Sequence, residues 1–191
     1  MSPLRRVAPP AALALALALA PLAVVADPWP ALAIPPENAR SLRAPPRRPP
    51  PGDVDARARL LVEALRTGDP ADVQRAEGFF LPREPFLAIK DMSGAAGYFA
   101  TLVRWFRRDL LAERARRRDW SGARFEGFEL SRACTWMNIG REANRLPYWS
   151  CYRSTLRVAV GGRSERVEVR VMIHWGDRWY ATHLGAIPAR H

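Results

Sequence analysis

The spacing of apolar residues changes once along this 191-residue chain, near Trp120. Before that point apolar residues recur every three or four positions, which is typical of amphipathic helices. After it they alternate with polar residues, which is typical of strands with one buried face. A chain with its helices first and its strands second is predicted to be α+β, with the helices packed on a sheet.

Two helices are predicted at the start of this region. The first covers residues 53–69, and Gly68 is predicted to end it. The second begins at Asp69, whose side chain can cap the helix, and Pro70 suits the first turn. The two helices are therefore expected to follow each other with almost no loop between them.

A longer third helix is predicted to follow. Residues 82–92 carry two prolines and predict only a turn or a single helical turn. Ser93 is then expected to cap a helix over residues 93–118. Its apolar stripe consists of Tyr98, Phe99, Leu102, Phe106 and Leu110. We expect this stripe to pack against the sheet.

The alternating region predicts a curved, four-stranded antiparallel meander. Gly161-Gly162 is a strong signal for a two-residue hairpin turn. A turn there sets Leu156 beside Val167 and Tyr152 beside Val171, all on one face. The four strands are predicted over residues 123–138, 148–160, 165–175 and 179–187.

The N-terminal quarter predicts export. Residues 1–26 combine a basic start, an apolar run and small residues before Ala26, as in a secretory signal peptide cleaved after Ala26. Nine of the 26 residues in 27–52 are proline, which predicts a disordered spacer. Its stretch APPRRPPP is also a candidate ligand for an aromatic groove. Residues 53–191 then form one domain, placed in the periplasm or outside the cell.

The chain is basic, with a formal charge of +11, and almost all of the positive charge is arginine. Lys90 is the only lysine, a bias that high-GC genomes produce. We therefore do not predict a nucleic-acid partner. In an exported protein the charge favours contact with anionic envelope surfaces or polymers.

The last strand is the basis for a resemblance to a known family. Its pattern resembles the closing strand of the nuclear-transport-factor-2-like (cystatin-like cone) superfamily, through Trp175, Asp177, Trp179, Tyr180, His183 and Leu184. The segments FFLPREPFLAIKD, YFATLVRWFRRDL and RWYATHL are also similar to uncharacterised exported proteins of high-GC proteobacteria such as myxobacteria. The resemblance implies a cone-shaped α+β fold over most of residues 53–187. That fold hosts enzymes, binding modules and scaffolds, so it implies no single activity.

The two cysteines are predicted to form a disulfide, because export places them in an oxidising compartment. If Cys134 and Cys151 face each other across the first hairpin, Trp136 must face Trp149 on the same side.

The same strict pairing has a consequence further down the hairpin. It places Phe128 opposite Arg157, which contradicts an inward-facing Leu156. Both patterns hold only if a β-bulge shifts the pairing, near residues 132–133 or 153–154, or if the cysteines are not directly opposed.

The sequence gives little support for a metal site or for an active site with a nucleophilic side chain. With a two-residue turn, His174 faces Trp179 and His183 faces Arg170, which places the two imidazoles too far apart for a ligand pair. A three-residue turn would put the two histidines on opposite faces of the sheet. No HExxH, CxxC or GxSxG motif occurs. We therefore predict neither a metal nor a cofactor.

Three functions remain for such a domain. The leading hypothesis is a non-catalytic binding or scaffold domain for a small apolar or anionic envelope ligand, or for a partner protein, with Tyr152, Trp175 and Tyr180 as binding residues. The alternative is an isomerase- or cyclase-like enzyme, in which a pocket carboxylate, Asp109, works with Tyr98 or Tyr152. The third is a dimerising module, which an exposed apolar sheet face would favour.

Overall fold

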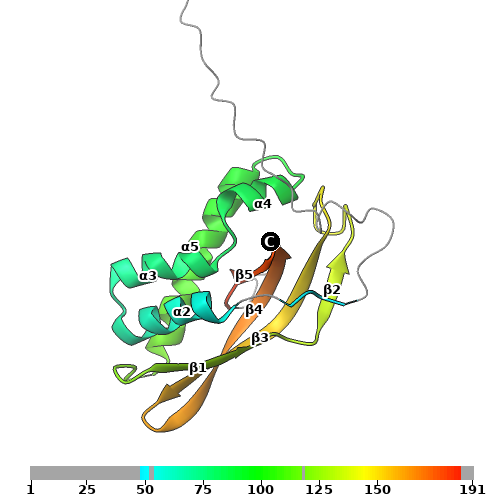
Figure 1. Ribbon diagram of the computed structural model, residues 1–191. Coiled ribbons are helices and arrows are strands. Elements are labelled where there is room, and N and C mark those ends of the chain that lie inside the picture. Colours follow the sequence, from blue (N-terminus) through cyan, green and yellow to red (C-terminus); the bar gives the residue numbers. More distant parts are fainter. Residues whose placement is uncertain (1–47, 52–53, 118, 186–191) are drawn as a thin grey trace, which may run out of the picture. The chain divides into compact units, whose positions relative to one another are not determined.

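The computed structural model describes residues 48–51, 54–117 and 119–185, and within them four α-helices precede a five-stranded sheet (Figure 1). The helices are α2 (Asp55–Thr67), α3 (Pro70–Ala76), α4 (Arg83–Ile89) and α5 (Ala95–Ala115), with a 3-10 turn, η1 (Glu77–Phe79), after α3. The strands are β1 (Arg124–Glu129), β2 (Cys134–Met137), β3 (Tyr148–Val160), β4 (Arg163–Trp175) and β5 (Arg178–His183). The α+β class is therefore confirmed. The predicted signal peptide and residues 27–47 lie outside the described residues.

The first two helices begin and end as predicted. Gly68 adopts a left-handed conformation, with φ of 66°, and ends α2. The Asp69 side chain accepts a hydrogen bond from the backbone N–H of Ala71 at 2.7 Å and so caps α3. Local capping chemistry is sufficient to set this junction.

The next two helices differ from the prediction. Residues 83–89 form a complete helix, α4, because Pro85 falls in its first turn, where a backbone N–H has no helical partner anyway. Helix α5 has Gly94 at its N-cap, with φ of 74° and no side-chain cap, so the predicted cap by Ser93 is wrong. Glycine reaches this conformation without the strain that serine would carry.

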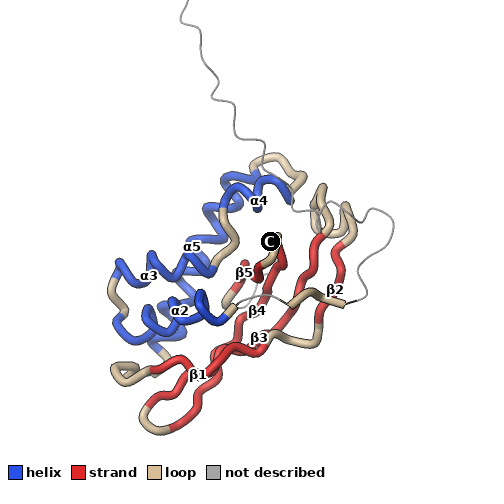
Figure 2. Tube along the Cα trace, viewed as in Figure 1, coloured by secondary structure: helices blue, strands red, loops and turns tan. Residues whose placement is uncertain are grey.

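The sheet is antiparallel, with the order β1-β3-β4-β5 and with β2 also paired to β3. Val160 pairs with Arg163, so Gly161-Gly162 is the two-residue turn, and both glycines have positive φ. Leu156 pairs with Val167 and Tyr152 with Val171, which confirms the predicted register. Figure 2 shows the long β3–β4 hairpin as the centre of the sheet, with the helices gathered to one side.

The predicted first strand is in fact two strands on the same edge of β3. Cys134 lies opposite Cys151 and the two form a disulfide, while Trp136 lies opposite Trp149. Below them, Phe128 lies opposite Leu156, one residue out of step with the cysteine pairing. The extra residue lies in the break between β1 and β2, residues 130–133.

Two other features accompany that break. Arg153, across from it on β3, has a positive φ of 61°. A second shift, between Phe125 and Gly127, lies lower on β1. The predicted bulge below the disulfide is therefore confirmed, and splitting the strand gives five strands instead of four.

The core lies between the helices and one face of the sheet. Helix α5 contributes Leu102, Phe106 and Leu110, all fully or nearly buried, from the predicted stripe. They pack with α2 residues against the inward residues of the central hairpin, among them Leu156, Val158, Val167 and Val169. The free edge of β5 is covered because the backbone N–H of Leu81 donates to the carbonyl of Ala181 at 2.9 Å.

Candidate functional site

The loop between β2 and β3 is fastened to the end of α4 by buried polar groups. Asn144 is 1% exposed; its side chain accepts from the N–H of Glu142 and donates to the carbonyls of Asn138 and Leu146. Lys90 donates to the carbonyl of Glu142 at 2.9 Å. These bonds hold Glu142 over the upper end of the sheet.

Two tyrosines of β3 meet this glutamate. The hydroxyl of Tyr148 donates to Glu142 Oε2 at 2.7 Å, and that of Tyr152 donates to Oε1 at 3.3 Å. Lys90 Nζ lies 4.0 Å from the same carboxylate. Burial, reinforced by the charge of Glu142, raises the pKa of Tyr148 above its usual value. Burial also raises the pKa of Tyr152, so both phenols are protonated donors at neutral pH.

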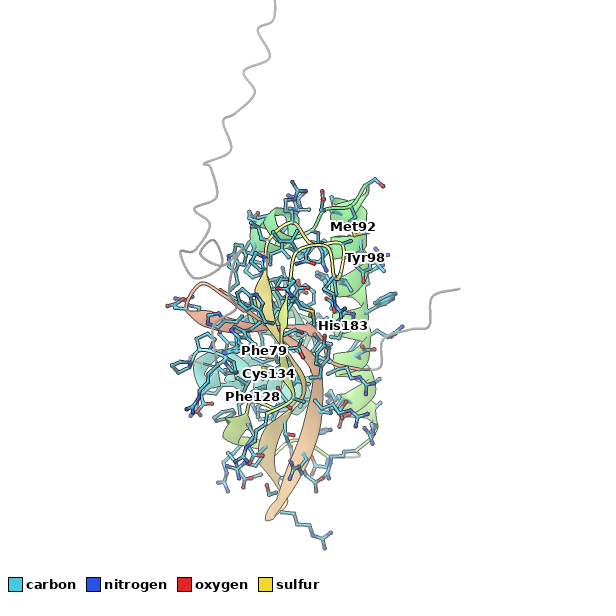
Figure 3. The ribbon with its side chains drawn as sticks, turned by 90° about the vertical axis from the view of Figure 1, so that its right-hand side faces the viewer. Phe79, Met92, Tyr98, Phe128, Cys134 and His183 are labelled. Carbon is cyan, nitrogen blue, oxygen red and sulfur yellow. A yellow bond between two sulfur atoms is a disulfide. The ribbon has the colours of Figure 1, made fainter. Side chains whose placement is uncertain are left out.

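His183 lies on the same face of the sheet, at the end of β5. Its ring is 6.4 Å from that of Trp105 on α5. Burial lowers the pKa of His183, while the negative charges of Asp109 and Glu142 oppose that shift. Figure 3 shows His183 and Tyr98 between the strands and helix α5. We call Tyr98, Glu142, Tyr148, Tyr152 and His183, with Lys90, the tyrosine–histidine cluster.

A polar atom at this end of the sheet has unused hydrogen-bonding capacity. His183 Nε2 is buried and has no hydrogen-bond partner among the described residues. Ser150 Oγ is also buried, and it lies close enough to the Tyr152 hydroxyl to lower the pKa of Tyr152, against the larger effect of burial. Buried polar atoms normally have partners, and those without them occur at functional sites or where water or a ligand completes the bonding. The cluster is therefore a candidate ligand site.

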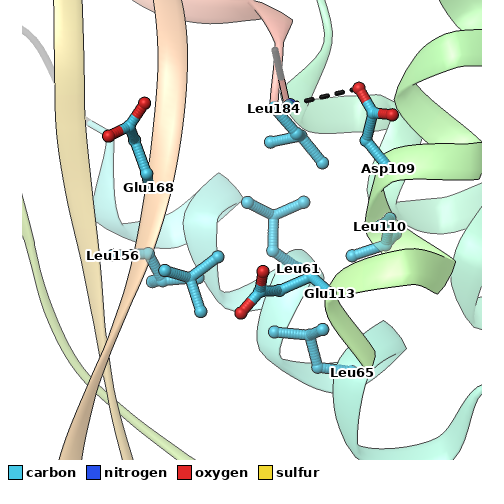
Figure 4. Close-up of a pocket in the computed structure, with 10 residues that line it drawn as sticks. Leu61, Leu65, Asp109, Leu110, Glu113, Leu156, Glu168 and Leu184 are labelled. Atoms are coloured by element: carbon cyan, nitrogen blue, oxygen red, sulfur yellow. Dashed lines mark hydrogen bonds between the residues drawn. The ribbon is translucent and has the colours of Figure 1, made fainter. Parts of the chain in front are cut away.

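Asp109, the predicted catalytic carboxylate, is already bonded within the fold. Its Oδ1 accepts from the guanidinium of Arg108 at 2.7 Å, and its Oδ2 accepts from the backbone N–H of Gly185 at 3.1 Å. The carboxylate borders a cavity of about 40 Å³ between the helices and the sheet (Figure 4). The lining is mostly leucine: Leu61, Leu65, Leu110, Leu156 and Leu184. A space of this size holds about one or two water molecules, whereas ligand pockets measure about 300–1,000 Å³.

The three predicted binding residues share one face of the sheet. Tyr152 pairs with Val171, and Tyr180 pairs with Ile173, two positions before Trp175 on β4. They are not equally accessible, however. Trp175 is buried, and the Arg57 guanidinium lies 4.3 Å from the ring centre of Tyr180. Only Tyr152 joins the tyrosine–histidine cluster.

Of the two strand partners predicted for the histidines, one is confirmed and one is wrong. His174 pairs with Trp179, as expected for the two-residue turn. The prediction that His183 faces Arg170 is wrong: a register shift beside Met172 places it opposite Val171 instead, on the other face from His174. Within the described ranges, no group of three or more His, Cys, Asp or Glu side chains is arranged to hold a metal ion.

The cluster's most important members were missed from the sequence. Lys90 lies 52 positions before Glu142, and no motif joins Glu142, Lys90 and Tyr148. The one available signal was that Lys90 is the only lysine in an arginine-rich chain.

Comparison with protein families, curated proteins and solved structures finds no match to this chain. Across residues 48–51, 54–117 and 119–185, no helix has the length and apolar character needed to cross a bilayer.

Proposed function

We propose that the protein is an exported, non-catalytic binding or scaffold domain of the nuclear-transport-factor-2-like type, and that the tyrosine–histidine cluster holds a small ligand. The observation that carries this proposal is the buried, unpartnered Nε2 atom of His183, with the buried Ser150 Oγ and Tyr152 hydroxyl on the same face of the sheet. The disulfide and the lack of a membrane-crossing helix in the described residues are compatible with export.

The ligand suited to this place is small and largely apolar, with at least one hydrogen-bonding group. Trp105 and Tyr98 offer aromatic surface, while His183 and Ser150 offer polar atoms. An anionic ligand is less well supported, because the nearest cation, Lys90, already interacts with Glu142.

The isomerase- or cyclase-like alternative has weaker support. It needs a carboxylate in an open apolar pocket, and Asp109 borders a cavity of about 40 Å³ while bonding to Arg108 and Gly185. The dimerising alternative relied on an exposed apolar sheet face. The exposed large apolar side chains among the described residues are Met92, Leu111 and Ile139, and none of them lies on a strand.

Mass spectrometry of the natively purified protein tests the proposal. We expect the native chain to release a small molecule on denaturation, and Tyr152→Phe and His183→Ala to release much less. Tyr180→Phe is the matched control, because Tyr180 lies on the same face of the sheet but outside the cluster. No retained molecule in the native chain, or equal retention in all variants, would overturn the assignment.

A further inference from the structure

Strand β1 has an edge that no other described strand pairs with. It stands at one end of the strand order β1-β3-β4-β5 and pairs only with β3. None of its six residues is buried, whereas β5 at the other end has three buried residues and is covered by the backbone of Leu81. An uncovered strand edge presents backbone N–H and C=O groups that can pair with another strand.

The sequence of β1, RFEGFE, complements its own reverse. If two copies pair antiparallel about a two-fold axis between Glu126 and Gly127, Arg124 lies opposite the partner's Glu129. Phe125 lies opposite the partner's Phe128 in the same arrangement. Opposite charges and aromatic side chains are both pairs that stabilise neighbouring strands. A second copy of this chain is therefore a chemically matched partner for this edge.

The β-bulge in β1 makes this pairing geometrically possible. Residues directly opposite each other in a continuous sheet point to the same face, whereas residues five apart in a regular strand point to opposite faces. In β1 the register shift at Glu126 removes that conflict. Arg124 and Glu129 pair with Ala159 and Thr155 of β3, which are four apart and share a face. The two phenylalanines likewise share the other face, where they pack against the core.

The charged side chains of β1 are placed to accept such a partner. Arg124 is exposed and forms no ion pair within the described residues. Glu129 is 49% exposed, although it contacts Arg157 at 3.3 Å. The Glu126 carboxylate accepts a hydrogen bond from the hydroxyl of Ser164 on β4, so it leans across β3 and away from the edge. The two copies of this carboxylate therefore stay apart, and the glycine at the axis has no side chain to obstruct the approach.

We propose that β1 is a self-pairing edge, through which two copies of this chain form a two-fold dimer with one continuous antiparallel sheet. The charges match in this register and not in others, so they select a second copy over unrelated strands. This mode of dimerisation needs no exposed apolar sheet face, and it does not involve the tyrosine–histidine cluster. Six residues on each copy make a small interface, so the dimer is weak and reversible.

Sedimentation equilibrium of the full chain, combined with a charge swap, tests the proposal. Arg124→Glu introduces two pairs of like negative charges into the dimer, and Glu129→Arg introduces two pairs of like positive charges. Each variant alone should dimerise at least about tenfold more weakly than the native chain. An equal mixture of the two variants should regain the native strength, because both pairs then have opposite charges. Arg141→Glu is the matched control: it makes the same charge change in the β2–β3 loop and should dimerise like the native chain.

Three results of this experiment would overturn the proposal. One is a native chain that stays monomeric up to about 1 mM. The second is a dimer that neither single variant weakens, and the third is a mixture of the two variants that does not recover. Circular dichroism shows whether each variant is folded.

Hydrogen exchange of the native chain tests the same idea without any substitution. The backbone amides of β1 should exchange more slowly at high than at low protein concentration. Equal exchange at both concentrations would count against the proposal, because the edge would then be free in both samples or covered by another part of the same chain.

Discussion

Removing the disulfide through the double substitution Cys134→Ala and Cys151→Ala is expected to lower the free energy of unfolding by about 3 kcal/mol. The cysteines are 17 positions apart. Closing a loop of that length removes about 10 cal/mol/K of entropy from the unfolded chain, which is about 3 kcal/mol at 25 °C. Alanine is preferred to serine because Cys151 is 0% exposed, and a hydroxyl there would be buried next to Met172.

Urea denaturation and thermal melting, each followed by circular dichroism, measure the effect. A loss of about 3 kcal/mol corresponds to a melting temperature lower by about 10 °C for a domain of this size. The denaturant slope should also rise, because an unfolded chain without the cross-link exposes more surface. Reducing the native protein with a thiol-free phosphine is the control, and it should give the same loss.

The outcome that contradicts this reasoning is a double variant within about 1 kcal/mol of the native protein. That result would mean that the loop is already restricted in the unfolded chain, or that the disulfide strains the native hairpin. A loss on reduction that the double variant does not reproduce would point to the free thiols rather than to the missing cross-link.

Three further predictions concern single residues. Because burial lowers the pKa of His183, the unfolded chain binds more protons than the folded chain below pH 6.5. The free energy of unfolding should therefore fall as the pH drops from 6.5. Thermal melts at several pH values measure this trend, and His183→Gln should make it less steep. Asn144→Ala removes three side-chain hydrogen bonds from a buried loop and should cost about 3 kcal/mol in urea denaturation; a cost below about 1 kcal/mol would show that water replaces them. Leu156→Ala, at a fully buried position, should cost about 3 kcal/mol, while Leu111→Ala, 47% exposed, should cost under about 1; equal losses would refute this placement of the core.

Rules that act between near neighbours in the sequence account for much of the fold. The helix junction at Gly68 and Asp69, the Gly161-Gly162 turn and the register of Leu156 with Val167 all depend on neighbours in sequence or on strict alternation. The bulge was also predictable, because two alternating patterns on one strand disagreed. Prediction was poorer where a proline was read as a helix breaker although it stood in a first turn, as at Pro85.

The candidate site was much less predictable. Of the residues that the sequence favoured, Tyr98 and Tyr152 belong to the tyrosine–histidine cluster, whereas Asp109 is bonded to Arg108 and Gly185. Glu142 was not among them, since a glutamate in a polar loop carries no signal of its own. Its position depends on Lys90, 52 residues away, and on the hydrogen bonds of the loop.

By itself, then, the sequence determined the class of fold, the pairing of the central hairpin and the partner of each cysteine, because periodicity and capping act over a few residues. Only the tertiary structure decided which polar groups meet and which distant segments come into contact. Those outcomes depend on contacts between distant segments, such as Lys90 with Glu142, 52 positions apart, and Trp179 with Pro50, 129 positions apart. No local pattern encodes such contacts, because they form only when packing brings two separately determined elements together.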